Sequence, residues 1–172
     1  MSIIPSSRTS MTLLLLACAL AAPTADAQSP PRDQAPQRTA QKAPTKPTPT
    51  VVHKLAIQVG ENKPEIMNLA LNNAKNVLEH FKARGEKVEV EIVTFGPGLH
   101  MLRDDTSPVK VRVAEMALSE PSLRFTACAN TQANHAKAEQ KTITLVSEAK
   151  LYPSGVVRLM ELQKQGFAYV RP

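Results

Sequence analysis

Residues 51–172 are predicted to form an α/β domain whose five-stranded, mainly parallel sheet is covered by helices on both faces. Short runs of alternating apolar and polar residues take turns with longer runs whose apolar residues recur every three or four positions. Glycine and proline residues punctuate the boundaries between the two kinds of run. Strands that alternate with helices in this way are typical of parallel sheets, because parallel neighbours need a crossover connection.

The first half of the domain should contain two strands and one long helix. The first strand is expected at 54–59 and ends at a glycine turn. A helix follows, with Pro64 in its first turn and Gly85 after its end, because an apolar stripe of helical period lies between them. The segment 88–95 is the clearest strand, since it alternates between valine or isoleucine and glutamate before both faces become apolar.

The second half repeats the pattern with shorter elements. A helix should start at Ser107-Pro108 and run to about Leu118, before Pro121. The later expectations are a strand at 123–127, a helix at 131–138, a turn of helix at 143–147, a strand at 149–152, a helix at 153–165 and a strand at 167–171.

Three loops should meet at one edge of this sheet. In open parallel α/β sheets, ligands bind at the carboxyl ends of the strands, where the loops lead into helices. The loops expected there contain Asn62 after the first strand, Gly96, Pro97 and Gly98 after the second, and Cys128, Asn130 and Thr131 after the third.

Cys128 is the principal candidate for chemistry. It is the only cysteine outside the first 27 residues, so it has no partner for a disulfide within the chain. The start of a helix favours an anion, and a thiol there can have a lowered pKa and react as a thiolate. The alternative is that Cys128 is a small apolar side chain that fills the end of a strand.

The other candidates each have a structural alternative. Gly96, Pro97 and Gly98 either cradle an anion or only allow the backbone to turn. Arg158 either offers a cation to the crevice or a neighbouring subunit, or is a surface arginine. The apolar stripe of the last helix is broader than one buried face needs, so part of it should pack against another subunit.

Acid–base, metal and nucleotide sites have weak support. His100 and His135 are the histidines that could approach the thiol, whereas His53 and His80 lie outside the expected edge. Four scattered histidines and one cysteine show no metal-ligand spacing, and no glycine-rich phosphate loop occurs. We therefore expect neither a bound metal nor a cofactor.

The first 50 residues read as an export signal and a linker. Arg8, an apolar stretch from Met11 to Ala22 and Ala25-Asp26-Ala27 indicate a cleavable signal peptide over 1–27, too short to span a bilayer. This predicts a periplasmic location, with Cys18 as a lipoprotein anchor as the alternative. Residues 28–50 hold six of the fourteen prolines and no large aliphatic or aromatic residue, so they should form a disordered linker.

The charge pattern disfavours a nucleic-acid partner. The net charge is +6, but four basic residues against one acidic residue fall in the linker. The domain itself has sixteen basic and thirteen acidic residues, and the aromatic residues that stack on single strands make up only 3% of the chain. We expect no nucleic-acid partner and no transmembrane segment.

Four segments together resemble the DsrE/DsrF-like sulfur-relay superfamily, in particular its exported branch. They are LRFTACANT around Cys128, LALNNAKN at 69–76, VEIVTFGPGLHML at 90–102 and YPSGVVRLMELQKQGFAYVRP at 152–172. The resemblance covers nearly all of 51–172, and the last segment is the most specific. One departure is that Ala129-Asn130-Thr131-Gln132 follow the cysteine, where relay members tend to have small and basic residues.

The resemblance implies a flavodoxin-like three-layer fold, assembly as a trimer or hexamer, and a cysteine that carries sulfur as a persulfide between proteins. Cys128 matches that cysteine, so the implied function is sulfur binding or relay, with a donor or acceptor protein as partner. The alternative is a noncatalytic oligomeric module that binds a small ligand and in which Cys128 is structural.

Overall fold

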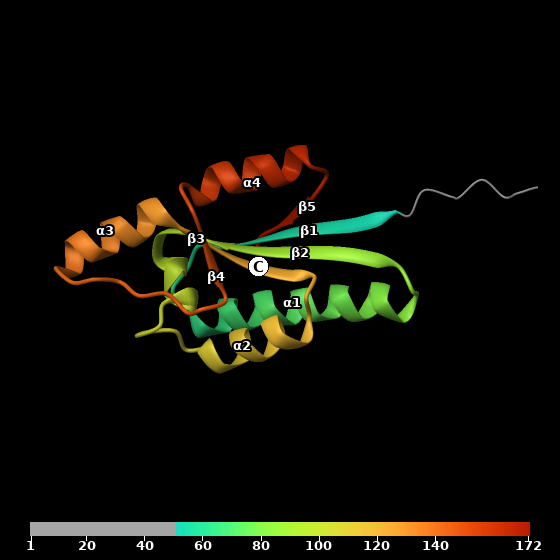
Figure 1. Cartoon of the computed structure of the whole chain (residues 1–172), viewed down its shortest axis with the longest axis horizontal. Helices are drawn as coiled ribbons and strands as arrows, with labels where there is room; N and C mark the ends of the chain where they lie inside the picture. Colours follow the sequence, from blue (N-terminus) through green and yellow to red (C-terminus); the bar gives the residue numbers. More distant parts are fainter. Residues whose placement is uncertain (1–50) are drawn as a thin grey trace, which may run out of the picture. The chain divides into compact units, whose positions relative to one another are not determined.

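The computed structural model describes residues 51–172, in which strands and helices alternate along the chain (Figure 1). The predicted signal peptide at 1–27 and linker at 28–50 lie outside the described residues. In chain order the elements are β1 (Val52–Val59), α1 (Pro64–Ala83), β2 (Lys87–Thr94), the 3₁₀ helix η1 (Gly96–Leu102), α2 (Lys110–Ser119), β3 (Leu123–Cys128), α3 (Ala129–Glu139), β4 (Ala149–Tyr152), α4 (Gly155–Lys164) and β5 (Ala168–Val170).

The five strands form one parallel sheet in the order β4-β3-β2-β1-β5. The chain moves outward from β1 to the edge strand β4, and then crosses back to place β5 on the other side of β1. In the centre, Ile57 lies opposite Ile92, and Ile92 lies opposite Phe125. The predicted α/β class with a flavodoxin-like, three-layer arrangement is confirmed.

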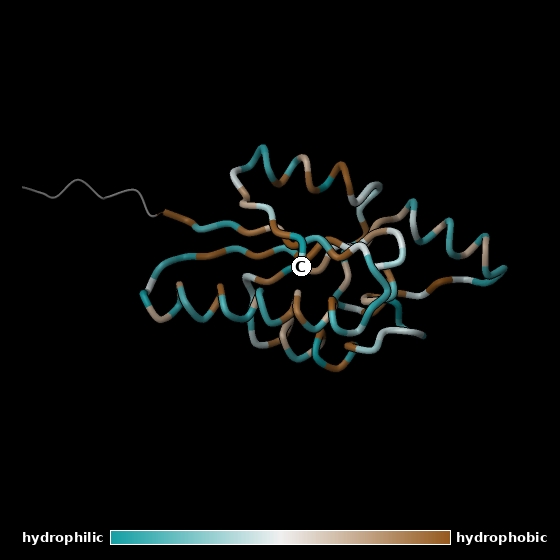
Figure 2. The backbone as a smooth tube through the Cα atoms, turned by 180° about the vertical axis from the view of Figure 1, so that it is seen from behind, coloured by the Kyte–Doolittle hydropathy of each residue, from teal (hydrophilic) through white to brown (hydrophobic). Residues whose placement is uncertain are grey.

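Helices cover both faces of the sheet. Figure 1 shows α1 and α2 on one face and α4 on the other, while α3 leads away from the carboxyl end of β3. Alternation along β2 supplies both cores: Val90 and Ile92 pack with α1 and α2, and Val93 packs with Leu159 and Leu162 of α4. Hydrophobic residues concentrate along the strands, whereas α1 and α4 alternate between hydrophobic and hydrophilic stretches (Figure 2).

Two helix predictions need correction. The helix expected from Ser107 begins at Lys110, because the Ser107 hydroxyl donates to the Met101 carbonyl at 2.6 Å and accepts from the Val109 amide at 3.3 Å. The expected turn of helix at 143–147 is wrong. Its backbone pairs with the end of η1 and the residues that follow it instead: the Val146 amide donates to the Leu102 carbonyl at 3.0 Å, and the Asp104 amide donates to the Thr144 carbonyl at 3.0 Å.

Two further segments differ from the sequence prediction. The segment Gly96–Leu102, expected as a loop, winds into η1. Helix α3 begins at Ala129, directly after Cys128, rather than at 131. Within 51–172, no helix combines the length and apolar character needed to cross a membrane.

Candidate functional site

Cys128 lies at the junction that the sequence predicted, as the last residue of β3 and the residue that precedes α3. Its backbone is still extended, with φ −80° and ψ 117°, and it pairs with Tyr152 on the edge strand. The residue is a free cysteine and is only 5% exposed. The thiol therefore lies at the carboxyl edge of the sheet but beneath the surface.

Hydrogen bonds from two helix starts act on this thiol. Burial raises the pKa of the Cys128 thiol, but hydrogen bonds from the Thr131 side chain and from the backbone amides of Gly155, Thr131 and Asn130 outweigh burial and leave the pKa below its ordinary value. The Asn130 amide also donates to the Pro153 carbonyl at 3.2 Å. The first turns of α3 and α4 together favour the thiolate.

The glycine loop after β2 contacts this site, and its glycines allow the backbone to approach closely. Gly96 has a positive φ of 53°, and its amide donates to the Thr131 hydroxyl oxygen at 3.0 Å. A Cβ atom on Gly98 would lie 2.1 Å from the Val59 carbonyl oxygen, so only glycine allows η1 to approach the end of β1 this closely. Both glycines thus have a role in the backbone geometry, and whether this loop also binds an anion stays a prediction.

The other loop residues that the sequence predicted for this site differ in their burial. Thr131 is buried beside Cys128, whereas Asn130, Pro97 and Asn62 are exposed. Asn62 lies in the loop between β1 and α1, and it is not among the groups that shift the pKa of Cys128. That these exposed residues line a pocket stays a prediction.

Arg158 binds a buried carboxylate that sequence reasoning did not single out. Its Nε and Nη2 atoms donate to the two oxygens of Glu91, each at 2.7 Å, and Glu91 is 1% exposed. Burial raises the pKa of Glu91, but hydrogen bonds from Arg158 and Thr126 outweigh it and lower the pKa overall. Because Glu91 occupies its guanidinium, Arg158 fixes α4 on the sheet rather than standing as a free cation in the crevice.

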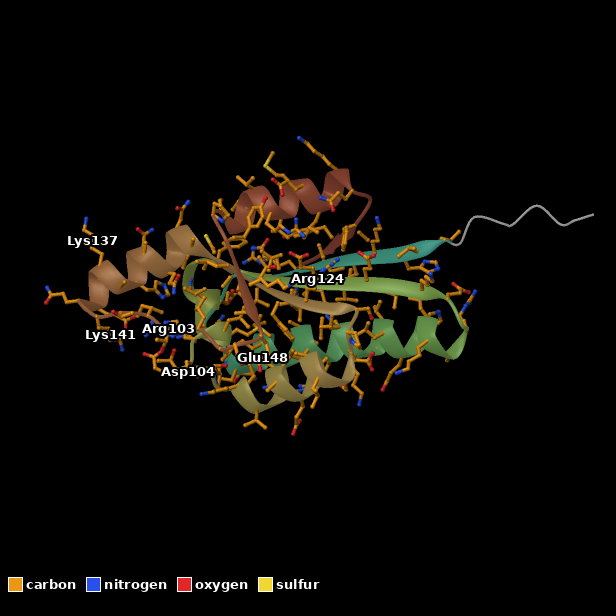
Figure 3. The ribbon with its side chains drawn as sticks, in the orientation of Figure 1. Arg103, Asp104, Arg124, Lys137, Lys141 and Glu148 are labelled. Carbon is orange, nitrogen blue, oxygen red and sulfur yellow. The ribbon has the colours of Figure 1, made fainter. Side chains whose placement is uncertain are left out.

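A second ion-pair network surrounds Arg103, which is fully buried. It donates to both oxygens of Asp105, at 2.9 and 2.8 Å, and to both oxygens of Glu139, at 2.5 and 2.8 Å. The Arg103 hydrogen bonds are the main reason that the pKa of Glu139 falls to about 2. Figure 3 shows Arg103 and Lys141 near each other by α3. The sequence pattern gave no signal for this network.

The histidines fall into two groups. His100 and His135 meet, with ring centroids 5.3 Å apart, whereas His53 stacks on Phe81 at 3.8 Å and bonds Glu86, and His80 contacts the edge of Phe81. Burial, Arg103 and His135 lower the pKa of His100. Neither His100 nor His135 is among the groups that shift the pKa of Cys128.

The broad apolar stripe of α4 divides between two surroundings. Leu159 and Leu162 are buried against the sheet, while Val156, Val157 and Met160 remain 54%, 45% and 54% exposed. Leu151 on the edge strand β4 is also 54% exposed. The outer face of α4 is therefore apolar and uncovered in the described residues.

Comparison with known proteins supports the fold. No family model matches the chain, and no curated protein matches it. Among solved structures, the chain is similar to "Protein of Unknown Function MTH1491" from Methanobacterium thermoautotrophicum, with 27% sequence identity and a TM-score of 0.58. The likeness covers 70% of this chain and 99% of that one.

Proposed function

We propose that this protein is an exported, DsrE-like sulfur carrier in which Cys128 takes up and passes on sulfane sulfur as a persulfide. The observation that carries the proposal is the set of donors around the thiol. The Thr131 side chain and the amides at the starts of α3 and α4 lower the pKa of Cys128 despite its burial. A lowered pKa increases the share of the thiolate, which is the nucleophilic form of the thiol.

The transfer step needs no redox cofactor. The Cys128 thiolate attacks the outer sulfur of a donor persulfide, a new sulfur–sulfur bond forms on Cys128, and the donor's sulfur–sulfur bond breaks. The leaving donor thiolate keeps the electron pair of the broken bond. An acceptor thiolate then attacks the outer sulfur on Cys128 and releases the Cys128 thiolate again. The sulfur atom moves at constant oxidation state, so atoms and electrons balance.

Backbone dipoles supply the anion stabilisation in this proposal. Residues 129–132, which directly follow Cys128, include no basic residue, and the Arg158 guanidinium is held by Glu91. Amide groups at helix starts serve the same purpose without a cation, because the helix dipole favours negative charge there. The persulfide anion should therefore be stabilised by the same donors that lower the pKa of the thiol.

Export and oligomerisation complete the proposal. The first 27 residues have the anatomy of a signal peptide, which supports a periplasmic location. The exposed apolar face formed by Val156, Val157 and Met160 supports a homo-oligomer with α4 at its interface. Donor and acceptor would be other thiol proteins or small persulfides.

Mass spectrometry tests the carrier function directly. After incubation with glutathione persulfide and removal of excess reagent, the wild-type protein should gain one sulfur atom, which dithiothreitol should remove. Cys128→Ser, which keeps the size of the side chain, should gain none. An unmodified wild-type protein whose thiol reacts with alkylating reagents only after unfolding would overturn the proposal.

One observation favours a second candidate, a noncatalytic module that binds a small ligand. Cys128 is only 5% exposed, as expected for a cysteine that fills the end of a strand. In that case the Cys128→Ala variant should keep the fold of the wild type and should still hold any ligand that the wild type binds. The native wild-type protein should gain no sulfur atom from glutathione persulfide. The same mass spectra therefore separate the two candidates.

A further inference from the structure

Three side chains with metal-ligating atoms converge where η1 meets α3. His100, His135 and Glu139 each offer one ligand atom, and the three atoms lie within 4.8 Å of one another. His100 belongs to η1, whereas His135 and Glu139 belong to α3. Sequence spacing did not predict this cluster, because 35 residues separate the two histidines and only the fold brings their segments together.

The backbone explains why these side chains meet. His135 and Glu139 stand four residues apart on α3, and residues at this spacing share one face of a helix. The Gly96 amide bonds the Thr131 hydroxyl at 3.0 Å and so holds the start of η1 against the start of α3. His100, one turn further along η1, then lies over the face that carries His135.

We propose that His100, His135 and Glu139 form a binding site for a divalent transition-metal ion of the zinc class. Two imidazoles and one carboxylate are a donor set that zinc uses in proteins, with a fourth position left for water or a substrate. The same nitrogen donors also suit copper and nickel, whereas magnesium and calcium prefer oxygen ligands.

The ligand atoms need only a small movement to close around a metal. With metal–ligand bonds of about 2.0–2.2 Å in a tetrahedral arrangement, neighbouring ligand atoms lie roughly 3.4 Å apart. In this structure the three ligand atoms lie within 4.8 Å of one another, which is a wider spacing than a bound metal requires. We expect rotation of the side chains, with no change of the backbone, to supply the difference.

The surroundings of the two imidazoles suit metal binding. His100 Nδ1 is held by the Thr106 hydroxyl at 2.8 Å, which orients the ring and leaves Nε2 for a metal. His135 Nδ1 lies 3.4 Å from a nitrogen of Arg103, a long contact that leaves the ring free to turn.

Glu139 keeps capacity for a metal beside its basic partners. An ionised carboxylate accepts about four hydrogen bonds. Two Arg103 nitrogens and Lys141 Nζ, the latter at 3.1 Å, occupy three of these positions. Arg103 is buried and holds the carboxylate in place, whereas the Lys141 side chain is 50% exposed and can swing away. Asp105 and Glu139 balance the two cations, so the network itself is neutral.

Zinc titration of the full chain tests this site. The protein carries Cys18→Ser and Cys128→Ser and no affinity tag, so that no thiol or added histidine competes for the metal. Calorimetry should show one Zn²⁺ per chain, and Co²⁺ should give the visible absorption of a four-coordinate site. His100→Gln and His135→Gln should each weaken zinc binding by roughly tenfold or more.

Three controls make the result specific. His80→Gln, on α1, should leave zinc affinity unchanged, and circular dichroism should show that each variant remains folded. Lys141→Ala should bind zinc more tightly, because it removes a competing cation from Glu139. Absence of stoichiometric zinc binding, or equal loss in the His80 and His135 variants, would overturn the proposal. Because every protein lacks both thiols, the outcome is independent of the sulfur-carrier function.

Discussion

The Arg158 guanidinium on α4 holds the buried Glu91 carboxylate on β2 through two hydrogen bonds of 2.7 Å. The Thr126 hydroxyl on β3 donates to the same carboxylate at 2.7 Å, so the pair joins α4 to two central strands. Gly155 precedes Arg158 by about one helical turn, and its backbone amide is among the groups that lower the pKa of the Cys128 thiol. The ion pair thus fixes the helix start that lowers the pKa of the cysteine.

Removal of one partner should destabilise the fold strongly. Arg158→Met leaves Glu91 charged and buried, and such a change costs about 3–5 kcal/mol of unfolding free energy. Urea denaturation followed by circular dichroism measures this loss. Lys75→Met, which removes one partner of an exposed ion pair on α1, is the matched control and should have little effect. Glu91→Leu combined with Arg158→Met should recover part of the stability.

The ion pair of Glu91 and Arg158 should also make the stability of the fold depend on pH in the acid range. The pKa of Glu91 in the folded protein lies below its ordinary value of 4.5. Its contribution is therefore complete above pH 4.5 and is lost as the pH falls through the lower, folded-state pKa. Urea midpoints between pH 7 and pH 3 should fall more steeply in the wild type than in Glu91→Gln. Parallel curves for the two proteins would contradict this assignment.

Thr131 should control the reactivity of the thiol. Thr131→Val keeps the side-chain shape but removes the hydroxyl that lowers the pKa of Cys128, so this pKa should rise. The rate of alkylation by iodoacetamide at pH 7 should then decrease, and its pH profile should move to higher pH. Thr142→Val, at an exposed position, should react like the wild type. Equal profiles for all three proteins would show that the hydroxyl does not act on the thiol.

Gly98 should tolerate no side chain. In Gly98→Ala the new Cβ would meet the Val59 carbonyl oxygen at 2.1 Å, and backbone atoms cannot move aside as a flexible side chain can. We expect a loss of about 3 kcal/mol in unfolding free energy, at the upper end for overpacking. Gly60→Ala is the control, because its Cβ would meet only the end of the Gln58 side chain, at 3.2 Å. Similar urea midpoints for both variants would contradict the argument.

The outer face of α4 should mediate self-association. Val157→Glu places a charge on this apolar face and should reduce the mass measured by light scattering to that of a monomer. Leu118→Glu, on the 88% exposed Leu118 of α2, is the control and should leave the assembly intact. A wild-type protein that is already monomeric at micromolar concentration would exclude this interface.

Local patterns were sufficient to predict most of the fold. The alternation in 88–95 and the helical stripe before Gly85 specify their own elements, because burial of one face sets a period of two or 3.6 residues. The prediction of a helical turn at 143–147 was wrong because the backbone of this segment forms hydrogen bonds with Leu102 and Asp104. No local sequence pattern reveals these distant partners. The late start of α2 has a similar cause, since the Ser107 hydroxyl bonds the Met101 carbonyl.

The same distinction between local patterns and distant contacts applies to the candidate sites. The sequence alone was sufficient to predict that Cys128 lies where a strand ends and a helix follows, because both signals lie within nine neighbouring residues around Cys128. The tertiary structure was needed to show that the Gly155 amide acts on that thiol, that Glu91 occupies Arg158, and that His100 meets His135 and Glu139. These contacts join residues 27 to 67 positions apart, and the crossover connections of the parallel sheet, not any local preference, bring them together.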